Sequence, residues 1–133
     1  MQVKYEGRAE IVVAPGSAGD IGVLPSHAPL LMTMRPGVLR ATVHAAPAGA
    51  EKAAARRLEY AVSGGFLEIL PDKVVALCEA ALAGAEVDVE AARAECKRAE
   101  EALGAKRGGD DRAERAAVAW ANARLEVARA SSV

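Results

Sequence analysis

Aromatic residues are scarce in this sequence, at 3% of 133 positions, although hydrophobic residues of all kinds make up 52%. A core must therefore be built from Ala, Val, Leu and Ile, which bury less area per residue than Phe or Trp. Net charge is also small, since 17 basic residues face 18 acidic ones. This balance excludes the basic excess expected of a nucleic-acid-binding protein. The length suits one domain with at most one appendage.

Cysteine is equally rare. Cys78 and Cys96 are 18 positions apart, a spacing that fits neither a zinc site nor a redox pair. Cys78 belongs to the apolar run VVALC, and Cys96 falls on an apolar helical stripe. We expect both to be free thiols in a reducing, cytoplasmic setting, and we predict no metal site and no catalytic residue.

Long hydrophobic runs are missing as well. No stretch approaches the roughly 18 apolar residues of a membrane span, and the polar start MQVKYEGRAE has no secretory leader. We therefore expect no direct insertion into a membrane, so that any work at a membrane requires another protein to hold the chain there.

Short strands between turns are predicted for the first 84 residues. AEIVVAP is a brief apolar run, and VLRATVH and RRLEYAVSGG alternate apolar with polar residues as half-buried strands do. FLEILPDKVVALC has two apolar runs about Pro71-Asp72, which predicts a hairpin. We take 45–57 as a long surface loop. An antiparallel β-sandwich is the architecture that this pattern favours.

The periodicity changes after Gly84. Apolar residues then recur every three or four positions, which predicts two amphipathic helices forming an antiparallel hairpin over 86–130. Asp88 is the expected N-cap of the first helix and Gly104 its expected end, while Asp111 and Glu114 have the spacing of a capping box. The fold class is thus α+β, an all-β domain over 1–84 followed by an α appendage. Because the helical seams are mostly alanine, we expect weak attachment and a detachable hairpin.

The segment PGSAGDIGVLPSHAPLL, from Pro15 to Leu31, is unsuited to a helix because its prolines remove backbone donors. We interpret it as a rigid loop with an apolar tip. Together with PGVLR and SGGFLE at their present spacing, it resembles the epsilon subunit of bacterial F-type ATP synthase, the counterpart of the mitochondrial delta subunit. The resemblance covers about Tyr5 to Leu103 at the level of motifs.

The resemblance implies a noncatalytic rotor subunit at the cytoplasmic face of the cell membrane. It implies that the sandwich binds the gamma subunit and rests on the c-ring, and that the helices, when extended, contact the alpha/beta catalytic head and hinder ATP hydrolysis. The c-ring docking residues it implies are Asp20, Ser26, His27, Ala28 and Pro29. Helix contacts with the head are expected from Arg112, Arg115, Arg124 and Arg129.

Some members of that family bind ATP on the folded hairpin through (I/L)-D-x-x-R-A. The corresponding residues here are VDVEAA, Val87 to Ala92, in which Asp88 is kept but the arginine is replaced by Ala91. Asp88, Arg98 and Arg124 are the candidate nucleotide-binding residues. Because a bidentate phosphate contact is lost with the arginine, we predict weak or absent ATP binding.

Two departures from the family pattern bear on the sandwich. The family has a further strand before the point where this sequence begins, so we expect an open sheet edge, and the 45–57 loop is longer than usual. Two alternative functions remain: a free-standing helical-hairpin adaptor, and a small hydrolase using Ser26-His27 or Cys78. The second is disfavoured because adjacent Ser and His side chains diverge and no G-x-S-x-G elbow is present.

Overall fold

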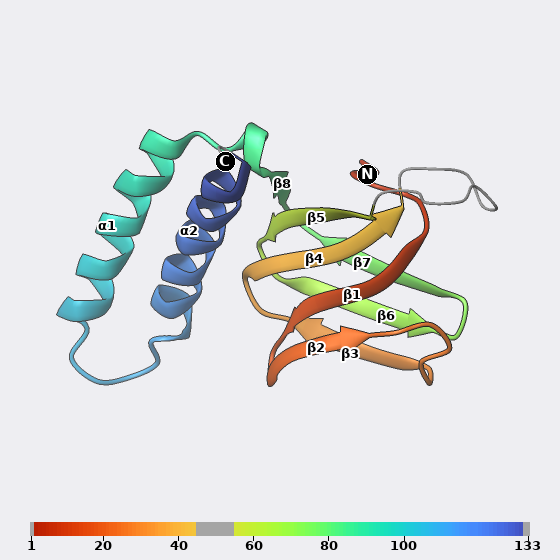
Figure 1. The fold of residues 1–133 in the computed structure, drawn as a ribbon. Coiled ribbons are helices and arrows are strands. Elements are labelled where there is room, and N and C mark those ends of the chain that lie inside the picture. The colour runs from red at the N-terminus through yellow and green to blue at the C-terminus, as the bar shows by residue number, and fades with distance from the viewer. Residues whose placement is uncertain (1, 45–54, 132–133) are drawn as a thin grey trace.

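The computed structural model describes residues 2–44 and 55–131. Strands and helices follow one another along the chain with the helices last, as Figure 1 shows. The strands are β1 (Ala9–Gly16), β2 (Gly19–Val23), β3 (Leu30–Met34), β4 (Gly37–His44), β5 (Ala55–Val62), β6 (Gly65–Leu70), β7 (Lys73–Cys78) and β8 (Ala81–Ala83). A 3-10 turn, η1 (Gly84–Glu86), leads to α1 (Val89–Ala105) and α2 (Arg112–Ser131).

The strands form an antiparallel sandwich. Their order is β7-β6-β3-β1-β4-β5-β8, and β2 pairs with β1. The link between β1 and β3 is the single pair Gly16–Met34, so the sheet folds over at this point into two layers (Figure 1). This arrangement confirms the predicted fold class, and the Leu70–Lys73 pair confirms the hairpin at Pro71-Asp72.

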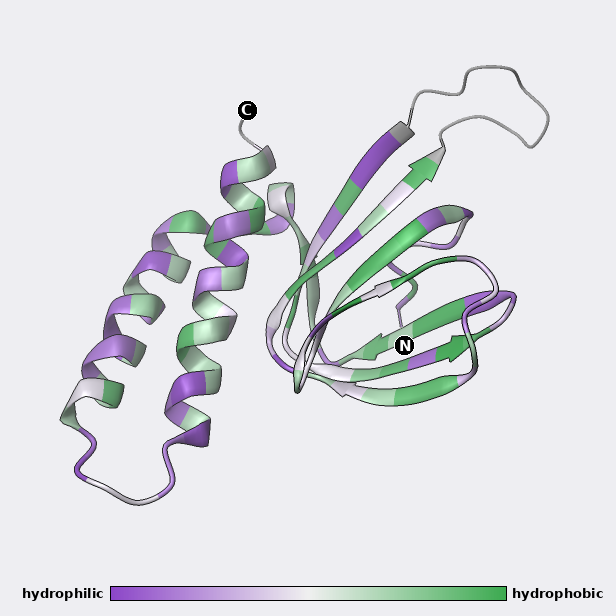
Figure 2. Ribbon diagram, turned by 60° about the horizontal axis from the view of Figure 1, so that its bottom comes forward, coloured by the Kyte–Doolittle hydropathy of each residue, from purple (hydrophilic) through white to green (hydrophobic). Residues whose placement is uncertain are grey.

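The sandwich core lies between the two layers. Ala14 and Val23 of one layer pack with Met34, Leu67 and Ile69 of the other, and Leu67 and Ile69 are fully buried. Apolar residues colour the strands more strongly than the helices in Figure 2. A core of this kind is stabilised by close packing of small aliphatic side chains, as the shortage of aromatic residues requires.

The helical hairpin lies beside the sandwich and contacts it mainly through α2 (Figure 1). A second apolar cluster joins Ala123 and Val127 of α2 to Val38 of β4 and Ala61 of β5. Ala61 lies on the same face of β5 as Glu59, the face that alternation predicts to be solvent-exposed. It is nevertheless buried, because α2 packs against it. Within the hairpin, α1 buries Ala92 and Cys96, which confirms the predicted stripe.

Several local expectations are corrected. The segment Pro15–Leu31 is not one loop: Pro15 and Gly16 are the last residues of β1, Gly19–Val23 is β2, and Leu30 opens β3. The turn from Gly16 to Gly19 lets the chain reverse, and Gly19 has a φ of 137° that favours glycine. Of the expected 45–57 loop, 45–54 lies outside the described residues, whereas 55–57 belongs to β5.

The helix ends also differ in part from expectation. Asp88 accepts a hydrogen bond from the Ala91 amide at 3.1 Å, which confirms the N-cap. Gly104 does not end α1, because the helix continues to Ala105, and the positive φ angles occur later, at Gly108 and Gly109. The predicted capping box is also wrong in its contacts, since Asp111 pairs with Arg115 and Glu114 with Lys106.

Gly65 offers a stability test. Its φ is 144°, and a Cβ built there would lie 2.0 Å from the Leu77 carbonyl oxygen, a backbone atom that cannot easily retreat. Gly65→Ala should therefore lower the free energy of unfolding by about 2 kcal/mol or more. Gly104→Ala is the matched control: nothing lies within 4 Å of its Cβ position, and in a helix the change should stabilise by about 0.5–1 kcal/mol. Urea unfolding of both variants measures the difference, and equal midpoints would contradict the close approach.

Candidate docking surfaces

The loop that follows β2 is held at its base and exposed at its tip. The Ser26 amide donates to the Pro71 carbonyl at 3.2 Å, which ties the loop to the β6–β7 turn. Ser26 has a φ of 65°, a conformation that few non-glycine residues adopt. His27 donates from Nδ1 to the Ala28 carbonyl at 2.7 Å. Ser26, Ala28 and Pro29 are exposed.

Asp20 is placed differently. Its carboxylate accepts a hydrogen bond from Arg35 at 2.5 Å, and Arg35 also donates to the Gly16 and Pro15 carbonyls. Asp20 therefore lies beside the β1–β2 turn, near the end of β3 at Met34. The loop that contains Ser26 instead leads into the start of β3 at Leu30. A strand of five residues spans about 17 Å. The structure thus separates Asp20, near the start of β2, from Ser26–Pro29, which follow the end of β2.

The edge formed by β2 connects these two places. Among the described residues, β2 has a backbone partner on one side only, namely β1. We call β2, Asp20 and residues 26–29 together the β2 edge. A partner that contacts both Asp20 and His27 must run along this edge, over roughly 20 Å at 3.3 Å per residue.

A second surface is the outer side of the β3-β6-β7 layer. The strand register aligns Thr33 with Phe66 and Leu77, and Leu31 with Glu68 and Val75. On this outer apolar face the exposed fractions are 68% for Leu31, 54% for Phe66 and 51% for Leu77. Large apolar side chains gathered on one face at such exposure indicate a binding surface rather than a solvated one. The sequence analysis did not predict this surface, because it placed the docking residues only in the segment from Asp20 to Pro29.

The outer apolar face continues into a cleft of about 660 Å³ that Phe66 and Leu77 line together with Ala116 of α2. The cleft therefore lies between the sandwich and the hairpin. Its other wall includes Gly64 and Gly65, held in place where Ser63 accepts from the Ala80 amide at 3.0 Å. Burial raises the pKa of Cys78 at this cleft, which makes its thiol a poor nucleophile.

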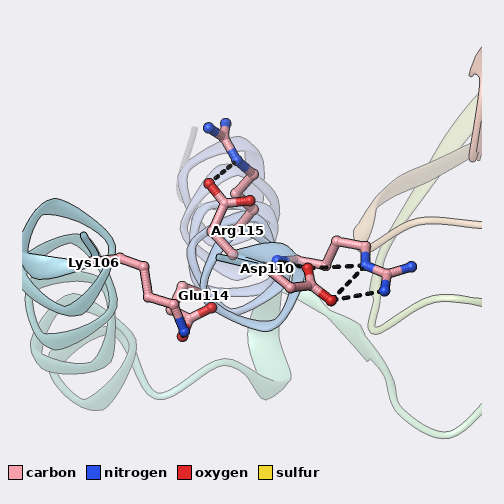
Figure 3. Close-up of polar contacts among 6 residues, drawn as sticks. Lys106, Asp110, Glu114 and Arg115 are labelled. Atoms are coloured by element: carbon pink, nitrogen blue, oxygen red, sulfur yellow. Dashed lines mark hydrogen bonds and ion pairs between the residues drawn. The ribbon is translucent and has the colours of Figure 1, made fainter. Parts of the chain in front are cut away.

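The arginines predicted to contact the catalytic head are mostly engaged within the hairpin. Arg112 pairs with Asp110 at 2.7 Å and Arg115 with Asp111 at 2.8 Å, around the turn between the helices (Figure 3). Arg124 pairs with Glu95 of α1 at 2.5 Å. Arg129 is exposed in the last turn of α2.

The candidate nucleotide-binding residues are brought near one another, but around an acid. Asp88 caps the N-terminus of α1, and Arg124 forms an ion pair with Glu95. The charges of Arg98 and Asp88 also affect the pKa of Glu95. The Glu95 carboxylate thus already pairs with the Arg124 guanidinium, which a bound phosphate would need as its own partner. Among the described residues, no three His, Cys, Asp or Glu side chains gather in a way that could hold a metal ion. None of the described helices is long and apolar enough to cross a membrane.

Comparisons with known proteins identify the family. The family model for the ATP synthase delta/epsilon chain, β-sandwich domain, matches residues 1–84. The ATP synthase epsilon chain of Laribacter hongkongensis is 44% identical over 108 residues, covering 81% of this chain and 70% of the relative. That of Desulfitobacterium hafniense (strain Y51) is 41% identical over 121 residues, 91% and 84% of the two chains. For Halorhodospira halophila the chain is 42% identical over 99 residues and spans 64% of the relative.

A solved structure has the same fold. One chain of the cryo-EM structure of the Euglena gracilis mitochondrial ATP synthase, OSCP/F1/c-ring, superposes with a TM-score of 0.68 at 20% identity. The match covers 91% of this chain and 70% of that one. At this identity it supports the sandwich with its two helices.

Acid should weaken the hairpin. Hydrogen bonds from Arg124, Arg112 and Lys106 lower the pKa of Glu95, Asp110 and Glu114, respectively. Folded pKa values below those of the unfolded chain mean that the unfolded chain binds protons first as pH falls. The stabilisation is therefore complete above the ordinary glutamate pKa of 4.5 and is lost as pH falls through the lowered values. Urea unfolding followed by helical circular dichroism between pH 7 and pH 3 should show this loss. Glu114→Gln should flatten the profile, and an unchanged profile would contradict the role of its ion pair.

Proposed function

The chain belongs to the ATP synthase epsilon-chain family, as a noncatalytic subunit of the rotary complex, and we propose that it joins the gamma subunit to the c-ring in a proton-transporting F-type enzyme. In this proposal the sandwich, residues 1–84, is the docking part and the hairpin, 86–130, the regulatory part. The chain is held peripherally at the cytoplasmic face of the membrane by its partners.

The outer apolar face is the observation that carries the proposal. Leu31, Phe66 and Leu77 form its exposed centre, and Thr33 and Glu68 border them. A half-exposed aromatic side chain surrounded by aliphatic ones is typical of the centre of a protein–protein interface. We assign this face to gamma, because a rotor subunit must stay bound through many turns and apolar burial gives lasting affinity without a fixed charge pattern.

The β2 edge is assigned to the c-ring. It is more polar, with Asp20 at one end and His27 at the other, and its loop is already fixed by the Ser26–Pro71 hydrogen bond. A pre-ordered loop loses little conformational entropy on binding. Asp20 already has Arg35 as a partner, so it would present a neutralised pair to the ring rather than a bare carboxylate.

The hairpin is assigned to the restraint of ATP hydrolysis. The buried contacts of α2 with the sandwich are Ala123 and Val127, with Trp120 packed beside them, and Glu126 of α2 pairs with Arg40 of β4 at 2.5 Å. Because this attachment is small, only a few kcal/mol separate the attached hairpin from an extended one. On extension Arg112, Arg115 and Arg124 would exchange their present carboxylates for acidic groups of the catalytic head. The Glu95–Arg124 pair supports weak or absent ATP binding by this hairpin.

The first test is of the gamma interface. The double substitution Leu31→Ser, Phe66→Ser should weaken binding to isolated gamma by about tenfold to a hundredfold, because two anchors of the outer apolar face are lost. Val3→Ser is the control, since Val3 is 71% exposed but outside this face. Titration calorimetry gives both affinities. Equal weakening by the control, or no weakening by the double variant, would remove gamma from this face.

The second test separates the ring from gamma. Asp20→Ala, His27→Ala should reduce binding to a gamma–c-ring subcomplex by about fivefold to twentyfold through lost polar contacts, while binding to gamma alone stays unchanged. Surface capture of the chain by each partner measures both. An equal loss with gamma alone would mean that the β2 edge serves gamma or the fold instead of the ring.

A further inference from the structure

Arg124 is the most confined charged side chain of the hairpin. It projects from α2 toward α1, where its Nη2 donates to Glu95 Oε2 at 2.5 Å. The guanidinium carbon lies 4.8 Å from the centre of the Trp120 ring, and Nε donates to the Trp120 carbonyl at 3.4 Å. Its side chain is only 12% exposed. The stack on Trp120 therefore fixes the direction in which Arg124 meets Glu95.

Four further ion pairs in the described part of the hairpin are local. Arg93–Glu90, Arg112–Asp110 and Arg115–Asp111 each link residues two to four positions apart. The Lys106–Glu114 pair spans only the turn between the helices, eight positions apart. Glu95 and Arg124 are 29 positions apart, on the bodies of the two helices.

Apolar burial between the helices is small. The buried residues of α1 are Ala92 and Cys96, and neither adds much transfer free energy. Removing the carboxylate partner of a nearly buried guanidinium is costly, because the charge then keeps only the 3.4 Å hydrogen bond to the Trp120 carbonyl in a confined place. The ion pair therefore carries an unusually large share of the preference for the closed hairpin.

We propose that Glu95 and Arg124, braced by Trp120, form the latch that holds α1 against α2 and sets how often the hairpin opens. Arg98 and Asp88 lie close enough to act on Glu95, so they tune the latch without replacing it. Its consequence rests on the proposed function: an acidic group of a partner that captures Arg124 would compete with Glu95, and partner binding would then open the hairpin.

Cys96 is a built-in probe of this opening. It is 8% exposed between the helices, and its Sγ lies 3.4 Å from Asn122 Oδ1 and 3.5 Å from Glu100 Oε1. If a thiol reagent reacts with Cys96 more slowly than the hairpin recloses, the rate of Cys96 labelling is proportional to the fraction of molecules with an open hairpin. Cys78, on the sandwich and only partly buried, is the reference thiol in the same sample, because it lies outside the contact between α1 and α2. Mass spectrometry separates the labelling rates of the two thiols.

In the isolated full chain, Glu95→Gln and Arg124→Gln should each speed Cys96 labelling by about three- to tenfold and leave Cys78 unchanged. The two substitutions remove charges of opposite sign, so a direct electrostatic effect on the thiol would change the rates in opposite directions. Only opening raises both. Glu90→Gln is the matched control, since Glu90 pairs within α1 with Arg93 on an exposed surface; it should leave both rates unchanged.

Three results would overturn the latch: no rise in either variant, a rise in only one, or an equal rise at Cys78 and Cys96. The outcome is independent of the proposed function. A chain whose Cys96 responds as expected but which fails to bind gamma would keep the latch and lose the rotor assignment, and the reverse result would do the opposite.

Discussion

The burial of Leu67 and Ile69 between the two strand layers is the contact on which the sandwich depends. The hairpin is attached by a separate cluster, in which α2 buries Ala123 and Val127 and packs the partly buried Trp120 against them. As the structure describes them, the two clusters have no residue in common. Because small side chains bury little area, loss of the second contact leaves the first intact. The proposed roles, a rigid docking part and a movable regulatory part, rest on this division.

The two parts meet at the cleft between the outer apolar face and α2. Phe66 and Leu77 belong to both the face and the cleft, and Ala116 forms the opposite wall. A partner bound to the face therefore lies beside the helix that must move. Within the hairpin, ion pairs take over the role that large apolar side chains have in the sandwich. The proposed regulatory part would therefore respond to charged partners more strongly than the outer apolar face does.

Much of this fold follows from local pattern. Alternation predicts β4 and β5, two apolar runs about Pro71-Asp72 predict β6 and β7, and the three- and four-residue spacing about Cys96 predicts α1. Strand β2 was missed because Gly19–Val23 is a short edge segment without alternation, stabilised by register with β1. The Arg35–Asp20 and Arg124–Glu95 pairs were missed for a similar reason: they join residues far apart in the chain. The family motifs predict a docking loop, but they do not predict its separation from Asp20.

Hydrogen exchange of the chain within an assembled gamma–c-ring complex tests the central claim most directly. The account predicts that amides of β3, β6 and β7, which underlie the outer apolar face, and of residues 20–29 become protected relative to the free chain. Amides on the exposed side of α1 should exchange as before. Protection of β4 and β5 instead, with β3, β6 and β7 unchanged, would contradict the assignment of the docking surfaces and the division between a docking sandwich and a movable hairpin.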